Sequence, residues 1–158
     1  MKFWKLFALA PLAAAVLFVS GSTAPQEAQA KNTLQYGRQY YAGWSGNYYQ
    51  TRGYYYRYYY YKPYATYTGY KHHYCIYYPK RPRYVYYYNP VRRRYWGRYD
   101  IEAKGYSLLA EADQKEKLTD IPEDAFPTPG SMPAIPESNE GDGTIDVPPV
   151  DDLPQVDG

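Results

Sequence analysis

The feature that most restricts the fold of this chain is the crowding of tyrosine into one segment. Of 25 tyrosines in 158 residues, 24 lie between Tyr36 and Tyr99. Between residues 31 and 100 the large aliphatic side chains are Leu34, Ile76, Val85 and Val91. A buried tyrosine hydroxyl needs a hydrogen-bond partner, and a short segment offers few partners for so many hydroxyls. We therefore expect most rings to lie at a surface, and no large hydrophobic core.

Charge divides the chain into two opposed blocks. From residue 31 to 100, 13 lysines and arginines stand against one acid, Asp100, a balance of +12. From residue 101 to 158, 3 lysines stand against 14 acids, a balance of −11. Such blocks can neutralise each other within one molecule or between molecules.

The first 30 residues have the pattern of a secretory signal peptide. Two lysines precede an apolar run at 6–19, and Ala28 and Ala30 give the small-x-small pattern of a cleavage site. The run is interrupted by Pro11 and is shorter than the roughly 20 apolar residues of a membrane-spanning helix. The pattern predicts a cleavable signal peptide over 1–30. It predicts export to the periplasm, cell envelope or exterior, with no membrane span after cleavage.

The mature chain falls into three segments by composition. Residues 31–100 are basic and rich in Tyr and Gly, 101–126 have the composition of a short helical segment, and 127–158 are acidic and rich in Pro. The last segment has few large apolar residues, so its burial cannot offset the entropy of ordering it, and we expect disorder there.

Two runs within the basic segment favour β-strands. Residues 72–78 and 83–88 are separated by Pro79–Pro82, a connection that fits a hairpin. Alternation places Tyr74, Ile76 and Tyr78 on one face of the first strand. In the second strand Val85 and Tyr87 share a face, and Tyr84, Tyr86 and Tyr88 share the other.

A single helix is expected after the basic segment. Ser107 is a suitable N-cap for a helix that continues to about Leu118 through Ala, Glu, Lys and Leu. The fold class predicted from sequence is therefore a largely disordered, low-complexity chain without a large core. It contains at most a small hairpin at about 72–88 and one short helix at about 107–118.

The cluster with metal-ligand chemistry is His72, His73 and Cys75. On a strand, His73 and Cys75 share a face and His72 points away, so at most two ligands converge where a structural zinc site needs four. Side chains two apart on a strand are also too distant to form a Cys–His nucleophile pair. Cys75 has no second cysteine for an intramolecular disulfide, so it is either a free thiol or an intermolecular link. We predict no metal, no cofactor and no catalytic residue, and thus no enzyme.

A second candidate is a basic and aromatic surface. Its residues are Lys80, Arg81, Arg83, Arg92, Arg93, Arg94, Tyr95 and Trp96. Inside a cell this combination favours single-stranded nucleic acid, but an exported chain meets acidic polysaccharide, anionic lipid or acidic protein instead, so no nucleic-acid partner is expected. The alternative partner is the chain's own acidic block.

The tyrosine clusters carry a third candidate chemistry. Phenols at high local density can be oxidised to radicals that couple as dityrosine, a reaction that needs an external oxidant. Without oxidation the rings can make adhesive contacts through stacking and cation–π pairs. The candidate cross-linking residues are Tyr54, Tyr55, Tyr56, Tyr58, Tyr59, Tyr60 and Tyr61.

Four short motifs in the second half carry a resemblance to a protein group. They are YWGRY at 95–99, KGYSLL at 104–109, IPEDAFP at 121–127 and MPAIP at 132–136. Together they resemble a group of short, exported, Tyr-rich bacterial proteins without an assigned function. The resemblance covers roughly residues 80 to 155. It implies export and the same block layout, and it supplies no activity, ligand or site.

These observations predict a non-enzymatic exported protein of the cell envelope or extracellular matrix. Its Tyr/Arg block would associate with itself or with an anionic envelope polymer, and its acidic tail would solubilise it or pair with charge. The alternative is a soluble secreted binding module for an anionic or carbohydrate ligand.

Overall fold

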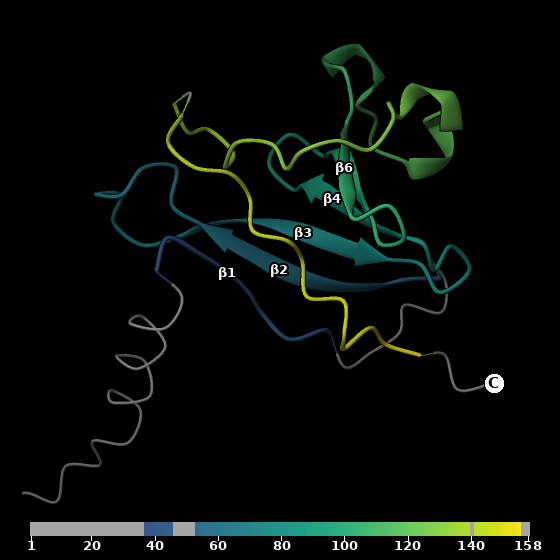
Figure 1. The fold of residues 1–158 in the computed structure, drawn as a ribbon, viewed down its shortest axis with the longest axis horizontal. Coiled ribbons are helices and arrows are strands. Elements are labelled where there is room, and N and C mark those ends of the chain that lie inside the picture. The colour runs from purple at the N-terminus through teal and green to yellow at the C-terminus, as the bar shows by residue number, and fades with distance from the viewer. Residues whose placement is uncertain (1–36, 46–52, 140, 156–158) are drawn as a thin grey trace, which may run out of the picture. The chain divides into compact units, whose positions relative to one another are not determined.

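A meandering antiparallel sheet organises the chain (Figure 1). The computed structural model describes residues 37–45, 53–139 and 141–155, which belong to the unit Gln35–Gly158. Its strands are β1 (Gln39–Tyr41), β2 (Tyr55–Tyr61), β3 (Lys71–Tyr77), β4 (Tyr84–Asn89), β5 (Arg94–Asp100) and β6 (Gly105–Leu108). Each strand pairs with the next in sequence. The predicted leader, with Ala28 and Ala30, lies outside the described residues.

Short polar residues set the two hairpin turns on either side of β5. The side-chain oxygen of Asn89 accepts hydrogen bonds from the backbone N–H groups of Val91 and Arg92. Asp100 does the same for the N–H groups of Glu102 and Ala103. Such side-chain turns favour chain reversal, so both hairpins are encoded locally.

The expectation of a largely disordered chain without a core is wrong. The sheet buries tyrosine on both faces, and the buried rings are Tyr59, Tyr61, Tyr77, Tyr86, Tyr87, Tyr95, Tyr99 and Tyr106. Some of their hydroxyls form hydrogen bonds with other tyrosine hydroxyls, as between Tyr95 and the half-buried Tyr78 at 2.8 Å. Because a tyrosine hydroxyl extends beyond the ring, it also reaches acceptors in the segments that cover the sheet.

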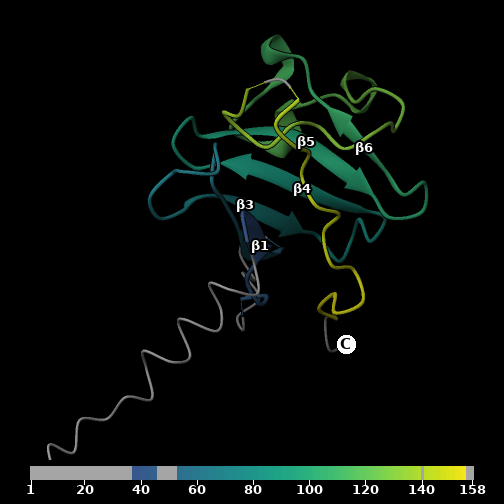
Figure 2. The ribbon, with the colours of Figure 1, turned by 60° about the vertical axis from the view of Figure 1, so that its left-hand side comes forward.

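The sheet curls from β1 to β6, so its two faces differ (Figure 2). On the inner face of the curl, Tyr106 of β6 belongs to the same buried cluster as Tyr59 of β2 and Cys75 of β3. Side chains from distant strands meet only on the concave side of a curled sheet. The hairpin predicted at 72–88 is present as β3 and β4, with Ile76 opposite Tyr86.

Residues 130–155, the tail segment, cover the inner face. Ile135 and Ile145 are buried there against the sheet cluster, and burying each such side chain contributes about 1.5–3 kcal/mol. Backbone oxygens of the tail segment accept hydrogen bonds from tyrosines, as between the Tyr41 hydroxyl and the Asp146 carbonyl at 2.7 Å. Figure 1 shows this segment in yellow as it crosses the sheet.

Ion pairs join the tail segment to the basic strands. Arg38 pairs with Asp142 at 2.8 Å and Lys71 pairs with Glu137. Arg57, which is 2% exposed, pairs with Asp152 at 2.9 Å and lies over the Trp44 ring at 4.2 Å. The two charge blocks thus neutralise each other within one molecule.

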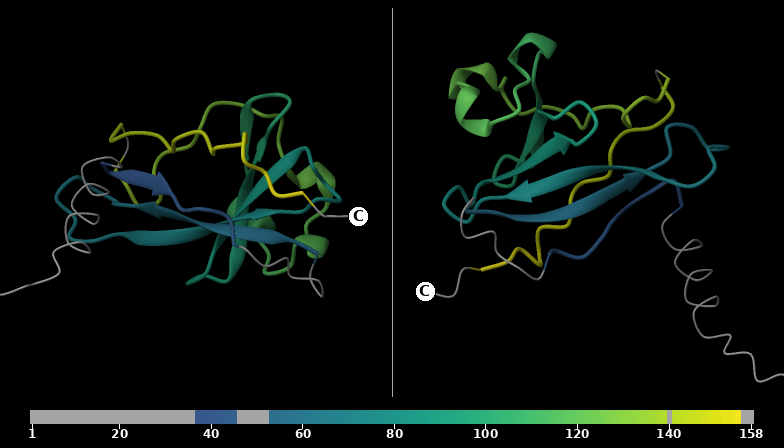
Figure 3. Two further views of the ribbon diagram at one scale, coloured as in Figure 1. Left: turned by 90° about the horizontal axis from the view of Figure 1, so that it is seen from below. Right: turned by 180° about the vertical axis from the view of Figure 1, so that it is seen from behind.

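Residues 109–126 cover part of the outer face, on the other side of the sheet (Figure 3). The helix predicted at 107–118 is absent. Instead β6 occupies Gly105–Leu108, and three single 3₁₀ turns follow at Glu111–Asp113, Leu118–Asp120 and Glu123–Ala125. Leu109 and Leu118 are buried on the outer face, whereas Leu108 is exposed. Among the described residues, no helix is long and apolar enough to cross a membrane.

Candidate functional site

Tyrosine rings that reach solvent line the outer face of β1 to β4. We call these side chains the outer tyrosine face, and they are Tyr40, Tyr56, Tyr58, Tyr60, His72, Tyr74 and Tyr88, each of intermediate exposure. They share one face because strand residues alternate. Residues 109–126 bury their apolar side chains against Tyr86 and Tyr95, and Tyr56, Tyr74 and Tyr88 pack at the edge of that cluster while part of each ring stays exposed. The face is a surface of aromatic rings rather than a closed core.

One row of rings crosses three strands at right angles to their direction. Strand register sets Tyr58 of β2 opposite Tyr74 of β3, and Tyr74 opposite Tyr88 of β4. The ring centroids are 5.2 Å apart for the first pair and 6.5 Å for the second. In this row, the tyrosine row, the ring planes are inclined by 55° in the first pair and by 20° in the second.

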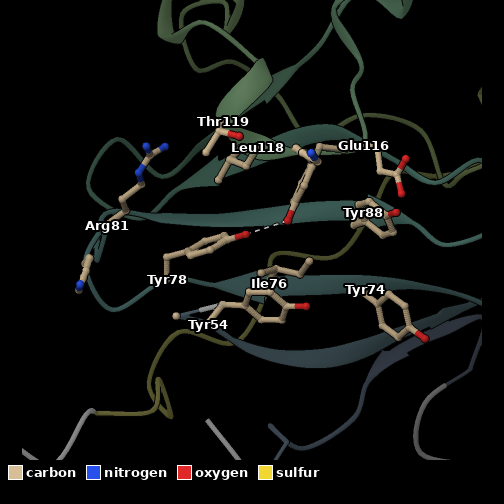
Figure 4. A pocket seen from close by; sticks show the side chains of 13 residues that line it. Tyr54, Tyr74, Ile76, Tyr78, Arg81, Tyr88, Glu116, Leu118 and Thr119 are labelled. Carbon is tan, nitrogen blue, oxygen red and sulfur yellow. Dashed lines mark hydrogen bonds between the residues drawn. The ribbon is translucent and has the colours of Figure 1, made fainter. Parts of the chain in front are cut away.

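The tyrosine row leads into a pocket of about 980 Å³. Its lining residues are Gly53, Tyr54, Tyr74, Ile76, Tyr78, Lys80, Arg81, Tyr88, Tyr95, Glu116, Lys117, Leu118 and Thr119. Figure 4 shows Arg81 at one end and Tyr74 and Tyr88 at the other, with Leu118 and Thr119 forming a wall. A volume of this size lies in the range of small-molecule sites, which are mostly apolar with a few polar groups.

Hydroxyl groups give the pocket its hydrogen-bonding capacity. The Tyr78 and Tyr95 hydroxyls share a hydrogen bond at 2.8 Å, drawn as a dashed line in Figure 4. Burial raises the pKa of Tyr74, Tyr78 and Tyr95 above the ordinary value of 10. These phenols therefore stay protonated at neutral pH and can donate or accept hydrogen bonds.

The charge around the pocket favours an anionic ligand. Lys80, Arg81 and Lys117 line it together with one acid, Glu116. Glu116 is already paired with Arg93 at 2.5 Å. The lining therefore carries a positive excess, and cationic side chains in a cleft attract anionic groups.

The structure divides the basic and aromatic set predicted from sequence. Lys80, Arg81 and Tyr95 line the pocket, whereas Trp96 is buried on the opposite, inner face of the sheet. Arg92 is exposed. The remaining members pair with acids of the second block or with Asp100, in the pairs Arg83–Asp100, Arg93–Glu116 and Arg94–Glu111. The set therefore does not form one continuous surface.

The predicted cross-linking tyrosines also lie on two faces. Tyr59 and Tyr61 are buried on the inner face, where Tyr55 packs at the edge of the same cluster. Tyr56 and Tyr58 point to the outer face with Tyr60. Tyr54 lines the pocket.

His73 and Cys75 lie on the inner face, as the alternation predicts. The His73 ring is 3.3 Å from the Tyr61 hydroxyl through Nε2, and burial lowers its pKa to about 4. Cys75 is buried as well, and burial raises the pKa of its thiol well above the ordinary value. In the described ranges, no group of three or more His, Cys, Asp or Glu side chains is placed to hold a metal ion.

Sequence reasoning missed most of the pocket. The alternation of Tyr74, Ile76 and Tyr78 could have revealed its floor, because one face of a strand then carries three apolar or aromatic groups. The wall formed by Glu116–Thr119 has no comparable signal, since the sequence pattern there predicts a helix that ends at about Leu118.

Comparison with protein-family models, curated proteins and solved structures finds no match to this chain.

Proposed function

We propose that this protein is an exported, non-enzymatic binding module for an extended carboxylated polysaccharide. The observation that carries the proposal is the tyrosine row, Tyr58, Tyr74 and Tyr88, which runs across the strands into a pocket with a positive excess. The predicted signal peptide supports a location where such polymers occur.

Sugar rings suit this surface for a physical reason. The C–H groups on the face of a pyranose carry slight positive charge, and the face of an aromatic ring is negative. Neighbouring strands lie about 4.8 Å apart, close to the length of one sugar unit in an extended chain. Successive sugars can therefore stack on Tyr58, Tyr74 and Tyr88 while their hydroxyls meet tyrosine hydroxyls.

The carboxylate specificity follows from the pocket cations. Lys80, Arg81 and Lys117 line the pocket, where a uronate carboxylate can accept charge-assisted hydrogen bonds. Exposed lysines alone bind anions weakly and are screened by salt. The rings therefore supply affinity for the polymer, and the cations select its charged members.

The binding test compares variants of the mature protein against soluble polysaccharides. Polygalacturonate, a neutral β-linked glucan and inorganic polyphosphate are titrated by calorimetry. We expect polygalacturonate to bind, and Tyr74→Ala to weaken binding by about 1–3 kcal/mol, as for loss of one stacking ring. The control Tyr64→Ala removes another tyrosine, 50% exposed and outside the outer tyrosine face, and should leave the affinity unchanged.

Two outcomes would overturn the proposal. Equal binding of polyphosphate and polygalacturonate would mean that charge alone recognises the ligand. Unchanged affinity in Tyr74→Ala, with the fold intact by circular dichroism, would show that the tyrosine row takes no part.

Self-association is the second candidate, favoured by the stacked rings of the outer tyrosine face. The opposed charge blocks that motivated it are engaged within the molecule, through pairs such as Arg57–Asp152 and Arg38–Asp142. For this reason we rank it below ligand binding. Sedimentation of the mature protein at low and high salt measures it directly, and a monomer in both conditions counts against it.

A further inference from the structure

Among the described residues of the outer tyrosine face, Tyr40 of β1 and Tyr60 of β2 are the stacked pair with the shortest centroid distance. They are direct cross-strand partners, with ring centroids 4.8 Å apart and ring planes inclined by 22°. Both are of intermediate exposure. Neighbouring strands thus hold two phenols nearly parallel, in contact, and within reach of solvent.

The next pair along the same two strands provides an internal comparison. Tyr41 and Tyr59 are also direct partners, with centroids 5.0 Å apart, but they lie on the inner face. Tyr59 has no exposed surface, and its hydroxyl donates to the Gln39 side-chain oxygen at 2.6 Å. The Tyr41 hydroxyl is held by the Asp146 carbonyl of the tail segment. The two pairs therefore share ring proximity and differ in access.

We propose that Tyr40 and Tyr60 are a site of oxidative modification, where a haem peroxidase and hydrogen peroxide couple the two rings into an intramolecular dityrosine. This inference does not depend on polysaccharide binding. It also extends beyond the sequence-predicted set, which lacks Tyr40 and treats Tyr54–Tyr61 as equivalent.

The reaction balances with peroxide as the oxidant. Each phenol loses one hydrogen atom from its hydroxyl to the activated peroxidase and becomes a phenoxyl radical with spin at the ring carbon next to C–OH. The two such carbons form a C–C bond, and each then loses its hydrogen to the oxygen of its own ring, which restores both phenols. The peroxide takes up the two electrons and two protons and leaves as water.

The geometry favours this pair over its neighbours. Tyr58 stacks on Tyr60 at 5.5 Å, but both belong to one strand, and Tyr70 meets Tyr40 edge-on at 5.1 Å and 83°. Tyr58 and Tyr74 are cross-strand partners 5.2 Å apart, but their ring planes are inclined by 55°. Coupling joins the ring carbon beside the hydroxyl-bearing carbon of one tyrosine to the same carbon of the other. Two nearly parallel rings on facing strands can bring these carbons into contact by a small shift of one ring over the other. The product would fasten β1, a strand of three residues at one edge of the described sheet, to β2.

The test treats the dilute mature protein with a plant peroxidase and hydrogen peroxide. Dityrosine fluorescence is followed, and cross-linked peptides are mapped by mass spectrometry with fragmentation. We expect a monomer that has lost two hydrogen atoms, with the bond between residues 40 and 60. Tyr60→Phe keeps the ring but lacks the O–H bond that must break, so it should lose this cross-linked peptide.

Tyr59→Phe is the matched control, one residue away on the buried face. It should retain the 40–60 cross-link at the wild-type yield, and circular dichroism confirms that both variants are folded. Absence of dityrosine in the treated protein would overturn the proposal. So would a cross-link between residues 41 and 59, exclusive coupling between molecules, or retention of the 40–60 peptide by Tyr60→Phe.

Discussion

At the scale of single residues, tyrosine replaces the aliphatic side chains of an ordinary core. Tyr87 shows how this works, because its ring is fully buried and its hydroxyl is 2.8 Å from that of Tyr41. Tyr41 in turn donates to the Asp146 carbonyl. A buried hydroxyl costs free energy only where it lacks a partner, so paired phenols can be buried at little cost.

His73 makes stability depend on pH. Burial lowers its pKa from the ordinary 6.5 to about 4, although the nearby Glu137 carboxylate acts in the opposite direction. Between pH 4 and pH 6.5 the His73 imidazole is mostly protonated in the unfolded chain and mostly neutral in the folded protein. The contribution of His73 to the free energy of unfolding is therefore fully present above pH 6.5 and is lost as the pH drops to about 4, by about 3 kcal/mol in total.

Chemical denaturation at several pH values measures this dependence. His73→Phe should flatten the profile between pH 6.5 and 4 relative to the wild type. His72→Phe is the control, since His72 lies on the outer face beside Tyr58, and it should keep the wild-type slope. A slope that survives in His73→Phe would assign the pH dependence to other groups.

At the scale of elements, the tail segment acts as a structural layer over the inner face. Ile145 is 2% exposed in the sheet cluster, whereas Val147, two residues later, is 55% exposed. Ile145→Ala should lower the free energy of unfolding by about 2–5 kcal/mol, because it removes buried methyl groups and leaves a cavity. Val147→Ala should change it by less than about 0.5 kcal/mol.

Thermal and urea unfolding of both variants provide the measurement. Equal stability of Ile145→Ala and the wild type would show that the tail segment contributes no packing energy and can leave the sheet freely.

The sequence predicted those elements whose pattern contained aliphatic side chains. The alternation around Ile76 and Val85 identified the hairpin of β3 and β4 and the faces of both strands. The strand β2 was missed, because its residues are tyrosines and one arginine, and tyrosine on either face hides the alternation. The helix at 107–118 failed because residues 105–108 pair with β5 instead, a long-range contact that local propensity does not encode.

The site was predicted in part for the same reason. Lys80, Arg81 and Tyr95 belong to the predicted basic and aromatic set and line the pocket, but Tyr74 and Tyr88 were seen only as strand residues. Their alignment with Tyr58 depends on register across three strands. The register of neighbouring strands is fixed by the pairing of the whole sheet, so no short sequence motif predicts this alignment of rings.

At the scale of the whole molecule, the opposed charge blocks fold onto each other. The acidic half covers both faces of the basic sheet and pairs with it, as Arg98 with Glu123 at 2.6 Å and Arg57 with Asp152 at 2.9 Å. Much of the charge that suggested an external partner is thus engaged internally. The outer face of β1 to β4 remains as a partly solvent-exposed aromatic surface within the described residues, and it is the surface on which we propose binding.

The most direct test of this account is a nuclear magnetic resonance titration of the isotope-labelled mature protein with polygalacturonate oligomers. The account predicts saturable shifts of the amide signals of β2 to β4 around Tyr58, Tyr74 and Tyr88, and around the pocket wall at Glu116–Thr119. Shifts confined to exposed lysines and arginines elsewhere, or no shifts at all, would contradict it.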